Sequence, residues 1–369
     1  MPKIVLENVT KKFGKFVAVE NLSMVIEDRS FITLLGPSGC GKTTTLRMIA
    51  GLEEPTSGKI TIDDVVVFDS EKGINISPAK RDVGFLFQNY ALWPHMTVYN
   101  NIAFGLENLK WPKDKIEERV NELLVMLKIE EFVKRYPSEL SGGQQQRVAI
   151  ARTLAPYPKI LFMDEPLSNL DAKLRLEMRT ELKRLHADTN STFVYVTHDQ
   201  LEAMTLATQI CLMKEGIVEQ IDPPLVTYDS PNNMFVADFV GIPSINLIEG
   251  KIKKEGKHYI VEAGEMKLKY EPNKEFELIN EEIVLGIRPE HIKIADSGLE
   301  GTIYSSLPSG METTVIIKRG KQLITSVLFG NVDFAQDTDV FYDFNSNNIV
   351  IFDKESQKNI SQGKLSIIK

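Results

Sequence analysis

A glycine-rich stretch near the N-terminus has the residue types that bind phosphate. Gly36-Pro-Ser-Gly-Cys-Gly41-Lys42-Thr43 follows an apolar run at Phe31–Leu35 and precedes a helix-like segment at 44–50. Glycines let backbone amides face phosphate oxygens, and a helix N-terminus adds partial positive charge. The pattern predicts an ATP site in which Lys42 reaches the β- and γ-phosphates and Thr43 ligates Mg²⁺. We expect the remaining loop residues to contact the nucleotide as well: Ser38, Gly39, Cys40, Gly41 and Thr44.

Two adjacent carboxylates follow another apolar run. Ile160–Met163 is wholly apolar and leads into Asp164 and Glu165. Because ligands of parallel sheets bind beyond the carboxyl ends of the strands, we expect Asp164 to hold Mg²⁺ and Glu165 to polarise the attacking water. The alternative is that both acids merely end a buried strand at a solvated loop. The phosphate loop favours the catalytic interpretation, since phosphoryl transfer needs a metal ligand and a group that orients the nucleophile.

A second glycine-rich turn, Leu140-Ser-Gly-Gly-Gln-Gln-Gln-Arg147, opens a helix-like run at 148–155. A serine, two glycines and a helix start again suit phosphate. Together with the loop and the acid pair, this turn resembles the signature L-S-G-G-Q of the ABC ATPase family. The resemblance implies a head-to-tail homodimer, in which each ATP lies between the phosphate loop of one chain and four signature residues of the other: Ser141, Gly142, Gly143 and Gln144.

Further positions match this family one by one. The resemblance implies that Gln88 contacts Mg²⁺ or its water and that Asp171, at the end of Ser168-Asn-Leu-Asp171, joins the two sites. It also implies that His198 contacts the γ-phosphate and that Phe13 stacks on adenine. A lone His or Phe more often packs than binds, so order and spacing carry these roles. There are two departures: Gln145 stands where many relatives have Arg or Lys, and Phe13 replaces the commoner Tyr or Trp.

The elements that must position these residues follow from hydrophobic periodicity. Between Tyr90 and Ala155 strand signals vanish and apolar residues recur at helical spacing. We therefore predict an α/β fold over residues 1–238, which the resemblance identifies with the RecA-like core of P-loop NTPases, containing a helical subdomain at about 90–155. Its strands are predicted at Lys3–Val9, Phe31–Leu35, Val83–Phe87, Ile160–Asp164, Phe193–Thr197 and Gln209–Met213.

From about residue 239 the pattern changes. Short alternating segments, such as Val284–Arg288 and Gln322–Phe329, are separated by Gly, Pro and Asn. They predict an all-β domain over 239–369. Gly241-Ile-Pro-Ser-Ile-Asn-Leu247 and Gly286-Ile-Arg-Pro-Glu-His291 resemble the junction and a marker of the OB-like (TOBE/MOP) domain of maltose-type sugar importers. In that group the domain helps hold the dimer and receives regulatory signals.

Partners follow from the same resemblance. Gln88–Phe104 resembles the importer segment that receives a helix of the membrane subunit, which implies two transmembrane permease subunits and, indirectly, an extracytoplasmic solute-binding protein. The alternative is that Trp93 and Tyr99 only pack the helical subdomain. The chain lacks a long apolar stretch and a signal-peptide layout, so we expect it at the cytoplasmic face of the membrane. Its two cysteines argue against a disulfide framework.

The cargo stays open between classes. The 241–247 resemblance favours a carbohydrate, but polyamine, ferric iron, sulfate and molybdate importers share the layout. A soluble ABC ATPase acting on nucleic acid is the remaining alternative. The net charge of −8 disfavours it, and we expect no nucleic-acid partner. The aromatic residues available for stacking alternate with polar ones and instead suit a barrel core: Tyr259, Tyr270, Phe329 and Phe341.

Overall fold

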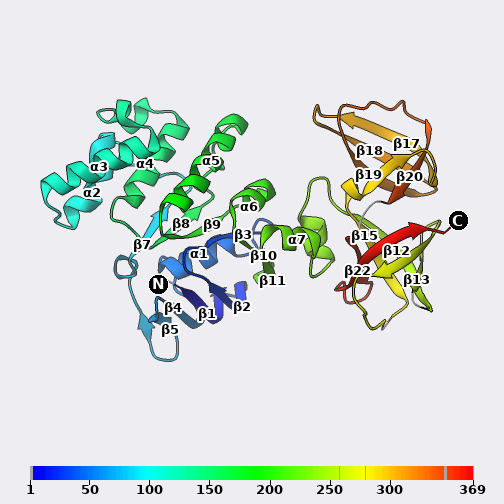
Figure 1. Ribbon diagram of the computed structural model, residues 1–369. Coiled ribbons are helices and arrows are strands. Elements are labelled where there is room, and N and C mark those ends of the chain that lie inside the picture. Colours follow the sequence, from blue (N-terminus) through cyan, green and yellow to red (C-terminus); the bar gives the residue numbers. More distant parts are fainter. Residues whose placement is uncertain (1–2, 257, 279, 345–346, 369) are drawn as a thin grey trace. The chain divides into compact units, whose positions relative to one another are not determined.

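The computed structural model describes residues 3–256, 258–278, 280–344 and 347–368 (Figure 1). The chain divides into two compact units, Met1–Pro224 and Leu225–Lys369. Two short helices, α7 (Pro224–Asp229) and α8 (Met234–Phe239), precede the β-rich part of the second unit.

The predicted boundary at residues 238 and 239 falls inside the second unit because a buried arginine attaches the two short helices to it. Arg288 donates hydrogen bonds to the carbonyl oxygens of Tyr228, Ala237 and Val240. Its guanidinium also lies 4.0 Å from the centre of the Tyr228 ring. These contacts satisfy the carbonyl groups at the C-terminal ends of both helices.

The sheet that matters for function is a six-stranded one in the first unit. Its order is β11-β10-β3-β9-β8-β7, and all neighbouring pairs from β10 to β7 are parallel. Strands β3, β8 and β9 are buried along their whole length, which explains their unbroken apolar sequences. Five strands of this sheet were predicted, and their bounds agree with the structure to within one residue at each end; β11 was not predicted. Their bounds are β3 Phe31–Leu35, β7 Val83–Leu86, β8 Ile160–Asp164, β9 Thr192–Val196, β10 Gln209–Lys214 and β11 Ile217–Asp222.

The first predicted strand belongs to a different sheet, and here the sequence interpretation was incomplete. An antiparallel sheet has the order β2-β1-β4-β5-β6, and only β1 was anticipated. Strands β1 and β2 form a hairpin whose last pair is Phe13 with Phe16, joined through Gly14 at φ 59°. One face of this sheet packs with helix α1 in a shared core. The bounds are β1 Ile4–Phe13, β2 Phe16–Ile26, β4 Ser57–Ile62, β5 Val65–Asp69 and β6 Ile74–Asn75.

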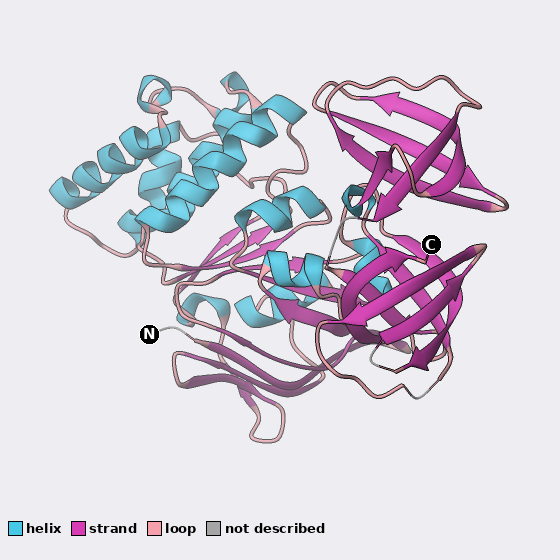
Figure 2. Cartoon of the chain, turned by 45° about the vertical axis from the view of Figure 1, so that its right-hand side comes forward, coloured by secondary structure: helices cyan, strands magenta, loops and turns pink. Residues whose placement is uncertain are grey.

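The helices of the first unit include the predicted helical block between β7 and β8. Within the described residues that block contains no strand, and its helices gather together as a group (Figure 2). Val120 and Leu123 are fully buried in its core, at the predicted spacing. The helices are α1 Lys42–Ala50, α2 Val98–Asn108, α3 Lys113–Leu127, α4 Gly142–Leu154, α5 Ala172–Asp188 and α6 Gln200–Leu206, with single 3₁₀ turns at Pro78–Lys80, Glu130–Phe132 and Pro137–Glu139.

The second unit is all-β beyond its short helices, as predicted. Six strands close a barrel in the order β12-β13-β14-β22-β21-β15, and five more form the sheet β16-β20-β17-β18-β19. The barrel strands are β12 Asn246–Glu255, β13 His258–Ala263, β14 Met266–Pro272, β15 Glu282–Ile287, β21 Ile349–Asp353 and β22 Asn359–Ile367. The sheet strands are β16 Ile292–Ala295, β17 Leu299–Pro308, β18 Glu312–Arg319, β19 Gln322–Phe329 and β20 Asp339–Phe344, with a 3₁₀ turn at Pro289–His291.

Two of the four aromatic residues assigned to the barrel core are not there. Tyr259 and Tyr270 are buried, but Phe329 is 88% exposed and Phe341 is 40% exposed. Side chains alternate between the two faces of a strand. The neighbouring Tyr342 takes the buried face of β20, so Phe341 must point outward. The prediction of buried aromatic residues is therefore correct for β13 and β14. It is wrong for β19 and β20, where the residues lie on the exposed face.

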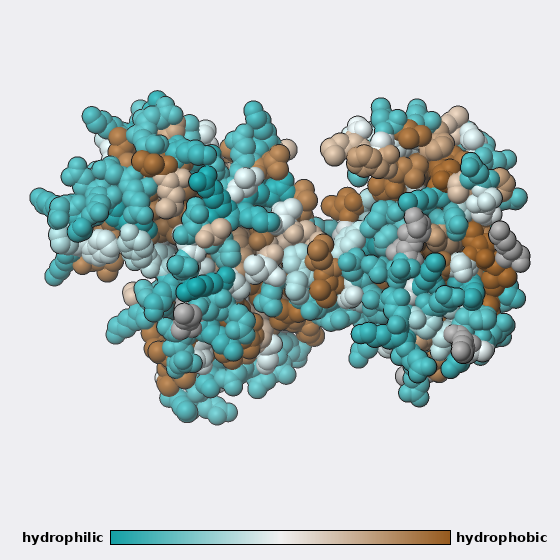
Figure 3. All heavy atoms as spheres, viewed as in Figure 1, coloured by the Kyte–Doolittle hydropathy of each residue, from teal (hydrophilic) through white to brown (hydrophobic). Residues whose placement is uncertain are grey.

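The helices of the described residues are too short or too polar for any of them to cross a bilayer. The face of the molecule seen in Figure 3 is largely hydrophilic, with apolar residues in scattered patches.

Candidate nucleotide-binding site

The predicted site residues follow four neighbouring parallel strands. In the order β3-β9-β8-β7, the strands lead into the glycine-rich loop 36–41, His198, the Asp164–Glu165 pair and Gln88. Because parallel strands point the same way, their carboxyl ends share one edge of the sheet. This edge is where open α/β sheets bind ligands.

The glycine-rich loop has a backbone that only glycine can adopt at two points. Gly41 has φ 99°, and a Cβ atom there would lie 2.5 Å from the carbonyl oxygen of Ala18. Gly36 has φ 150°, and its Cβ would lie 2.2 Å from the carbonyl oxygen of Met213. Gly39 also has a positive φ, but its surroundings are open. Close approach of neighbouring backbone thus fixes the loop at its two ends and leaves its middle accessible.

Lys42 is buried and its charge is held inside the loop. Its Nζ donates to the carbonyl oxygens of Gly36 at 2.7 Å and Pro37 at 2.8 Å. Cys40 is also buried. Burial raises the pKa of its thiol, although the charge of Lys42 opposes the shift. Ser38 is exposed and Thr44 is half-buried. The loop therefore presents one cation and several amides in a compact space.

Thr43 and Asp164 bring two oxygen ligands together. Thr43 Oγ1 donates to Asp164 Oδ1 at 2.8 Å, and Arg47 Nη2 lies 3.3 Å from Asp164 Oδ2. The described residues contain no cluster of three or more His, Cys, Asp or Glu side chains that could enclose a metal. This donor set fits Mg²⁺, which is commonly bound by one or two carboxylates together with phosphates and water.

Glu165 is held next to His198. It adopts a left-handed conformation, φ 45°, and its amide donates to the carbonyl oxygen of Val196 at 3.1 Å. His198 Nδ1 lies 3.3 Å from Glu165 Oε2. Ser168 Oγ donates to the Glu165 carbonyl oxygen at 2.8 Å, and Gln88 Nε2 donates to Ser168 Oγ at 3.3 Å. The structure thus links Gln88, Glu165 and His198, all of which were expected in one site.

The signature turn begins helix α4 with a capped N-terminus of the kind that suits phosphate binding. Ser141 Oγ accepts from the Gln144 amide at 3.4 Å, while Gln144 Oε1 accepts from the Ser141 amide at 2.8 Å. Ser141 and Gly142 are exposed, and a Cβ on Gly143 would lie 2.6 Å from Leu174. No hydrogen bond joins this turn to the glycine-rich loop in the described parts of the chain. The structure does not bring these predicted residues together.

Asp171 and Phe13 lie at element ends. Asp171 caps helix α5, where its Oδ1 accepts from the Leu174 amide at 3.0 Å. Phe13 ends β1 with 47% of its surface exposed, and the Lys11 ammonium lies 4.7 Å from its ring centre. Phe16, its partner across the hairpin, is even more exposed at 61%. The sequence interpretation did not identify Phe16 as the residue paired with Phe13, although the short spacing around Gly14 was a usable hairpin signal.

The aromatic residues of the segment 88–104 are mostly packed. Trp93 lies 4.4 Å from the Phe104 ring, and Arg152 covers it at 4.7 Å. Tyr99 packs against the core of the helical block. Arg152 also donates to the carbonyl oxygens of Tyr90 and Ala91. Trp93 and Tyr99 therefore pack within the helical block, and both side chains stay partly exposed.

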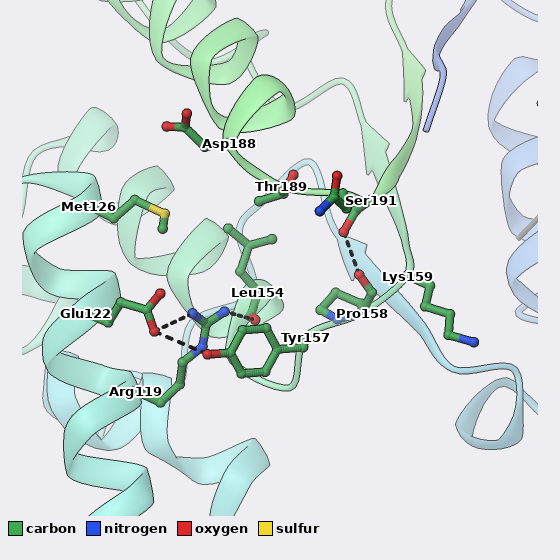
Figure 4. A pocket seen from close by; sticks show the side chains of 11 residues that line it. Arg119, Glu122, Met126, Leu154, Tyr157, Pro158, Lys159, Asp188, Thr189 and Ser191 are labelled. Carbon is green, nitrogen blue, oxygen red and sulfur yellow. Dashed lines mark hydrogen bonds and ion pairs between the residues drawn. The ribbon is translucent and has the colours of Figure 1, made fainter. Parts of the chain in front are cut away.

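A separate cavity of about 350 Å³ lies between α3, the 154–159 turn and the end of α5 (Figure 4). Arg119 forms part of its wall and donates to the carbonyl oxygens of Leu154 at 2.8 Å and Ala155 at 3.3 Å. Its guanidinium stacks 3.6 Å from the Tyr157 ring and bonds Glu122 at 2.8 Å. None of the predicted site residues lines this cavity. Arg119 supports the site indirectly, because it satisfies the C-terminal end of the helix that begins at the signature turn.

Family profiles match three parts of the chain. The profile described as ABC transporter covers residues 19–168, MalK OB fold domain covers 241–292, and TOBE domain covers 285–352. They confirm the predicted α/β ATPase core followed by OB-like β modules.

Similar proteins span most of the chain. The trehalose/maltose import ATP-binding protein MalK of Thermococcus litoralis is 43% identical over 98% of this chain and 100% of its own length. The spermidine/putrescine import ATP-binding protein PotA of Rubrobacter xylanophilus is 48% identical over 79% of this chain and 76% of its own. A dimeric post-hydrolysis structure of the ATP-binding cassette MJ0796 bound to ADP and Pi has a TM-score of 0.52 and 35% identity, and covers 60% of this chain and 98% of that one.

Proposed function

Because the chain belongs to the ATP-binding subunits of ABC transporters, we propose that it works as a homodimer that energises a carbohydrate importer. The chain is an importer ATPase.

The positions of the two turns that suit phosphate binding, one in the loop 36–43 and one at Ser141, support the dimer. One chain has a buried lysine in the loop 36–43 and, separately, an exposed helix start at Ser141 and Gly142. Neither turn alone surrounds a triphosphate on both sides. Two copies arranged head to tail would place each Ser141 against the γ-phosphate held by the other copy's Lys42. Such an interface needs no further element, because both turns are already built.

Within each composite site the residues divide the work. Amides of residues 38–44 and Lys42 bind the phosphates, and Phe13 stacks on adenine. Thr43, Asp164 and Gln88 hold Mg²⁺, which supplies positive charge to the phosphate oxygens when bound. Glu165 accepts a proton from the attacking water and orients it, and His198, whose Nδ1 lies 3.3 Å from that carboxylate, contacts the γ-phosphate. The partner's Ser141, together with Gly142, Gly143 and Gln144 of the same turn, closes the cage, and Asp171 joins the two sites across the dimer.

The membrane partners are inferred from the importer assignment. Two copies dock on two transmembrane permease subunits at the cytoplasmic face, and a solute-binding protein delivers cargo from outside. ATP-bound closure of the dimer and its reopening after hydrolysis would drive the permeases between two states.

The cargo rests on the match with MalK. It spans 98% of this chain and includes the β unit, where the profile described as MalK OB fold domain matches residues 241–292. The match with PotA, named for spermidine and putrescine import, is higher in identity but covers 79% of this chain. A polyamine is therefore the second candidate.

Uptake assays in a strain that lacks this chain separate the two candidates. The strain should lose uptake of radiolabelled maltose or trehalose and keep uptake of putrescine. The wild-type chain should restore sugar uptake, and Glu165→Gln should not. Loss of putrescine uptake with normal sugar uptake would replace the carbohydrate proposal with the polyamine one.

A further inference from the structure

One arginine connects the segment after the catalytic glutamate to the turn that carries His198. Arg175 lies in the first turn of α5, and its Nη2 donates to the carbonyl oxygen of Leu170 at 3.1 Å. On its other side, Nη1 lies 3.4 Å from Asp199 Oδ2 and Nε lies 3.9 Å from Glu202 Oε1. A single guanidinium thus spans two segments that are separate in sequence and adjacent at the site.

A buried carboxylate holds the turn that carries His198. Glu202 is 3% exposed, and its Oε2 accepts hydrogen bonds from Tyr195 Oη at 2.8 Å and Thr197 Oγ1 at 2.7 Å. The Asp199 amide in turn donates to Thr197 Oγ1 at 3.0 Å. Burial raises the pKa of Glu202, and its hydrogen bonds to Thr197 and Tyr195 oppose that shift. Residues on both sides of His198 are therefore held by the group that Arg175 faces.

The Leu170 side of Arg175 leads to the signature turn. Leu170 Cδ2 lies 3.7 Å from the point where a Cβ on Gly142 would be. Leu174, one residue before Arg175, lies 2.6 Å from the corresponding point on Gly143. The start of α5 and the residue before its cap thus form the surface on which the signature turn rests. A shift of Arg175 would move this surface.

The arginine is not fully satisfied where it lies. Its Nε is buried and has no hydrogen-bond acceptor within the described residues, because the nearest carboxylate oxygen, on Glu202, is 3.9 Å away. A buried N–H without a partner costs about 1–3 kcal/mol. A movement of roughly 1 Å would bring Nε and Glu202 to hydrogen-bond distance. Such a movement would give the cluster a second arrangement, which a bistable coupling element requires.

We propose that Arg175 is a positioning residue that links the His198 turn to the signature turn of the same chain, and so couples the two ATP sites of the dimer. The coupling rests on the proposed function, in which a chain's His198 serves one ATP and its Ser141 serves the other. A change at one γ-phosphate then reaches the second site through Asp199, Arg175 and Leu170.

Two substitutions test the link without creating a cavity in the core. Arg175→Lys keeps the charge but cannot reach Leu170, Asp199 and Glu202 at once. Asp199→Asn keeps the Oδ1 acceptor that caps α6 and removes the charge that faces Arg175. The matched control is Arg184→Lys on the same helix, whose partner Asp188 lies at the surface 3.6 Å away.

The readouts are kcat, KM, the Hill coefficient for ATP and the melting temperature of the full-length protein. Arg175→Lys and Asp199→Asn should lower kcat about tenfold and bring a Hill coefficient of about 2 toward 1, within the usual range of coupling between sites. Their KM for ATP should stay within about twofold, since no phosphate contact is removed. Melting temperatures should stay within about 2 °C of wild type, and the control should match wild type throughout.

Three outcomes would overturn the inference or its premise. Wild-type kcat and Hill coefficient in both variants would remove Arg175 from the site. A loss of kcat that came with a fall in melting temperature well beyond about 2 °C would assign Arg175 a structural role only. A Hill coefficient of 1 in the wild type would contradict the coupling of the two sites, whereas the shared sites of the proposed function are tested separately by mixing Lys42→Ala and Ser141→Arg chains. The kcat of Arg175→Lys would still decide whether Arg175 positions His198.

Discussion

Thr43 Oγ1 and Asp164 Oδ1 lie 2.8 Å apart although 121 residues separate them in the chain. Strand β9 lies between β3 and β8, so one parallel sheet brings the helix start after β3 next to the end of β8. We assign the Mg²⁺ site to this pair of oxygen atoms. Their proximity follows from the strand order alone.

Asp164→Asn tests the metal assignment. The substitution keeps one oxygen near Thr43 and removes the charge, so the Mg²⁺ concentration for half-maximal hydrolysis should rise about ten- to a hundredfold. A titration of ATPase activity with Mg²⁺ measures this, and chelation with EDTA should abolish hydrolysis. Asp188→Asn on the surface of α5 is the control. An unchanged Mg²⁺ requirement in Asp164→Asn would remove this residue from the metal site.

Glu165→Gln tests the role of the base. The amide cannot accept the proton of water, so kcat should fall by at least about a hundredfold while ATP still binds. Phosphate release and nucleotide-binding titrations measure the two effects separately. Glu177→Gln, exposed on α5, should behave as wild type. Near-normal turnover of Glu165→Gln would assign the base to another residue.

Gly41→Ala tests the close approach that shapes the phosphate loop. A Cβ 2.5 Å from the Ala18 carbonyl oxygen forces the loop to move, so the free energy of unfolding should fall by about 2–4 kcal/mol. Gly14→Ala is the matched control, because Gly14 also has a positive φ but no atom within 4 Å of the new Cβ. It should cost only the conformational strain, about 1–2 kcal/mol. Urea unfolding of both variants measures the difference. Equal losses in the free energy of unfolding would mean that the contact with Ala18 is unimportant.

The two cysteines should differ in reactivity. Burial raises the pKa of the Cys211 thiol to about 12, with a smaller contribution from Cys40. Alkylation requires the thiolate, so in the native protein at about pH 8 iodoacetamide should modify Cys211 more slowly than Cys40, whose loop is partly open. Peptide mapping measures both, and unfolding should make them equal. Faster labelling of Cys211 would contradict its buried position.

The same shift has a consequence for stability. Between pH 9.0, the ordinary pKa of a cysteine thiol, and about pH 12, the folded protein keeps the Cys211 proton that the unfolded chain loses. The unfolded state then binds fewer protons, so the free energy of unfolding must fall as pH rises through this window. Cys211→Ala should make that fall shallower in urea unfolding measured at several pH values.

How much the sequence could predict depends on whether a residue acts locally. The loop 36–43, the cap at Ser141 and the strand before Asp164 are local patterns, and the structure has each of them. The contact of Thr43 with Asp164 needed only the parallel order of the strands. These features are set by backbone chemistry over fewer than ten residues.

The rest needed tertiary structure. Strands β2, β4, β5 and β6 were missed because β1, which pairs with β2 and β4, was assigned to the α/β core, and no local pattern marks it as part of a separate antiparallel sheet. Phe329 and Phe341 were placed in the barrel because alternation gives two phases and no way to choose between them. Arg175 and Glu202 looked like ordinary helix residues, since their importance lies in carbonyl and hydroxyl groups of other segments.

The central claim is that each ATP is held by two copies of this chain, and mixing two inactive variants tests it most directly. Lys42→Ala removes the phosphate-loop cation, and Ser141→Arg blocks the signature turn. Neither variant alone should hydrolyse ATP, but each mixed dimer has one site with an intact Lys42 and an intact partner Ser141. The account predicts ATPase activity in the mixture that neither parent shows. A mixture that stays as inactive as its parents at every ratio would contradict it.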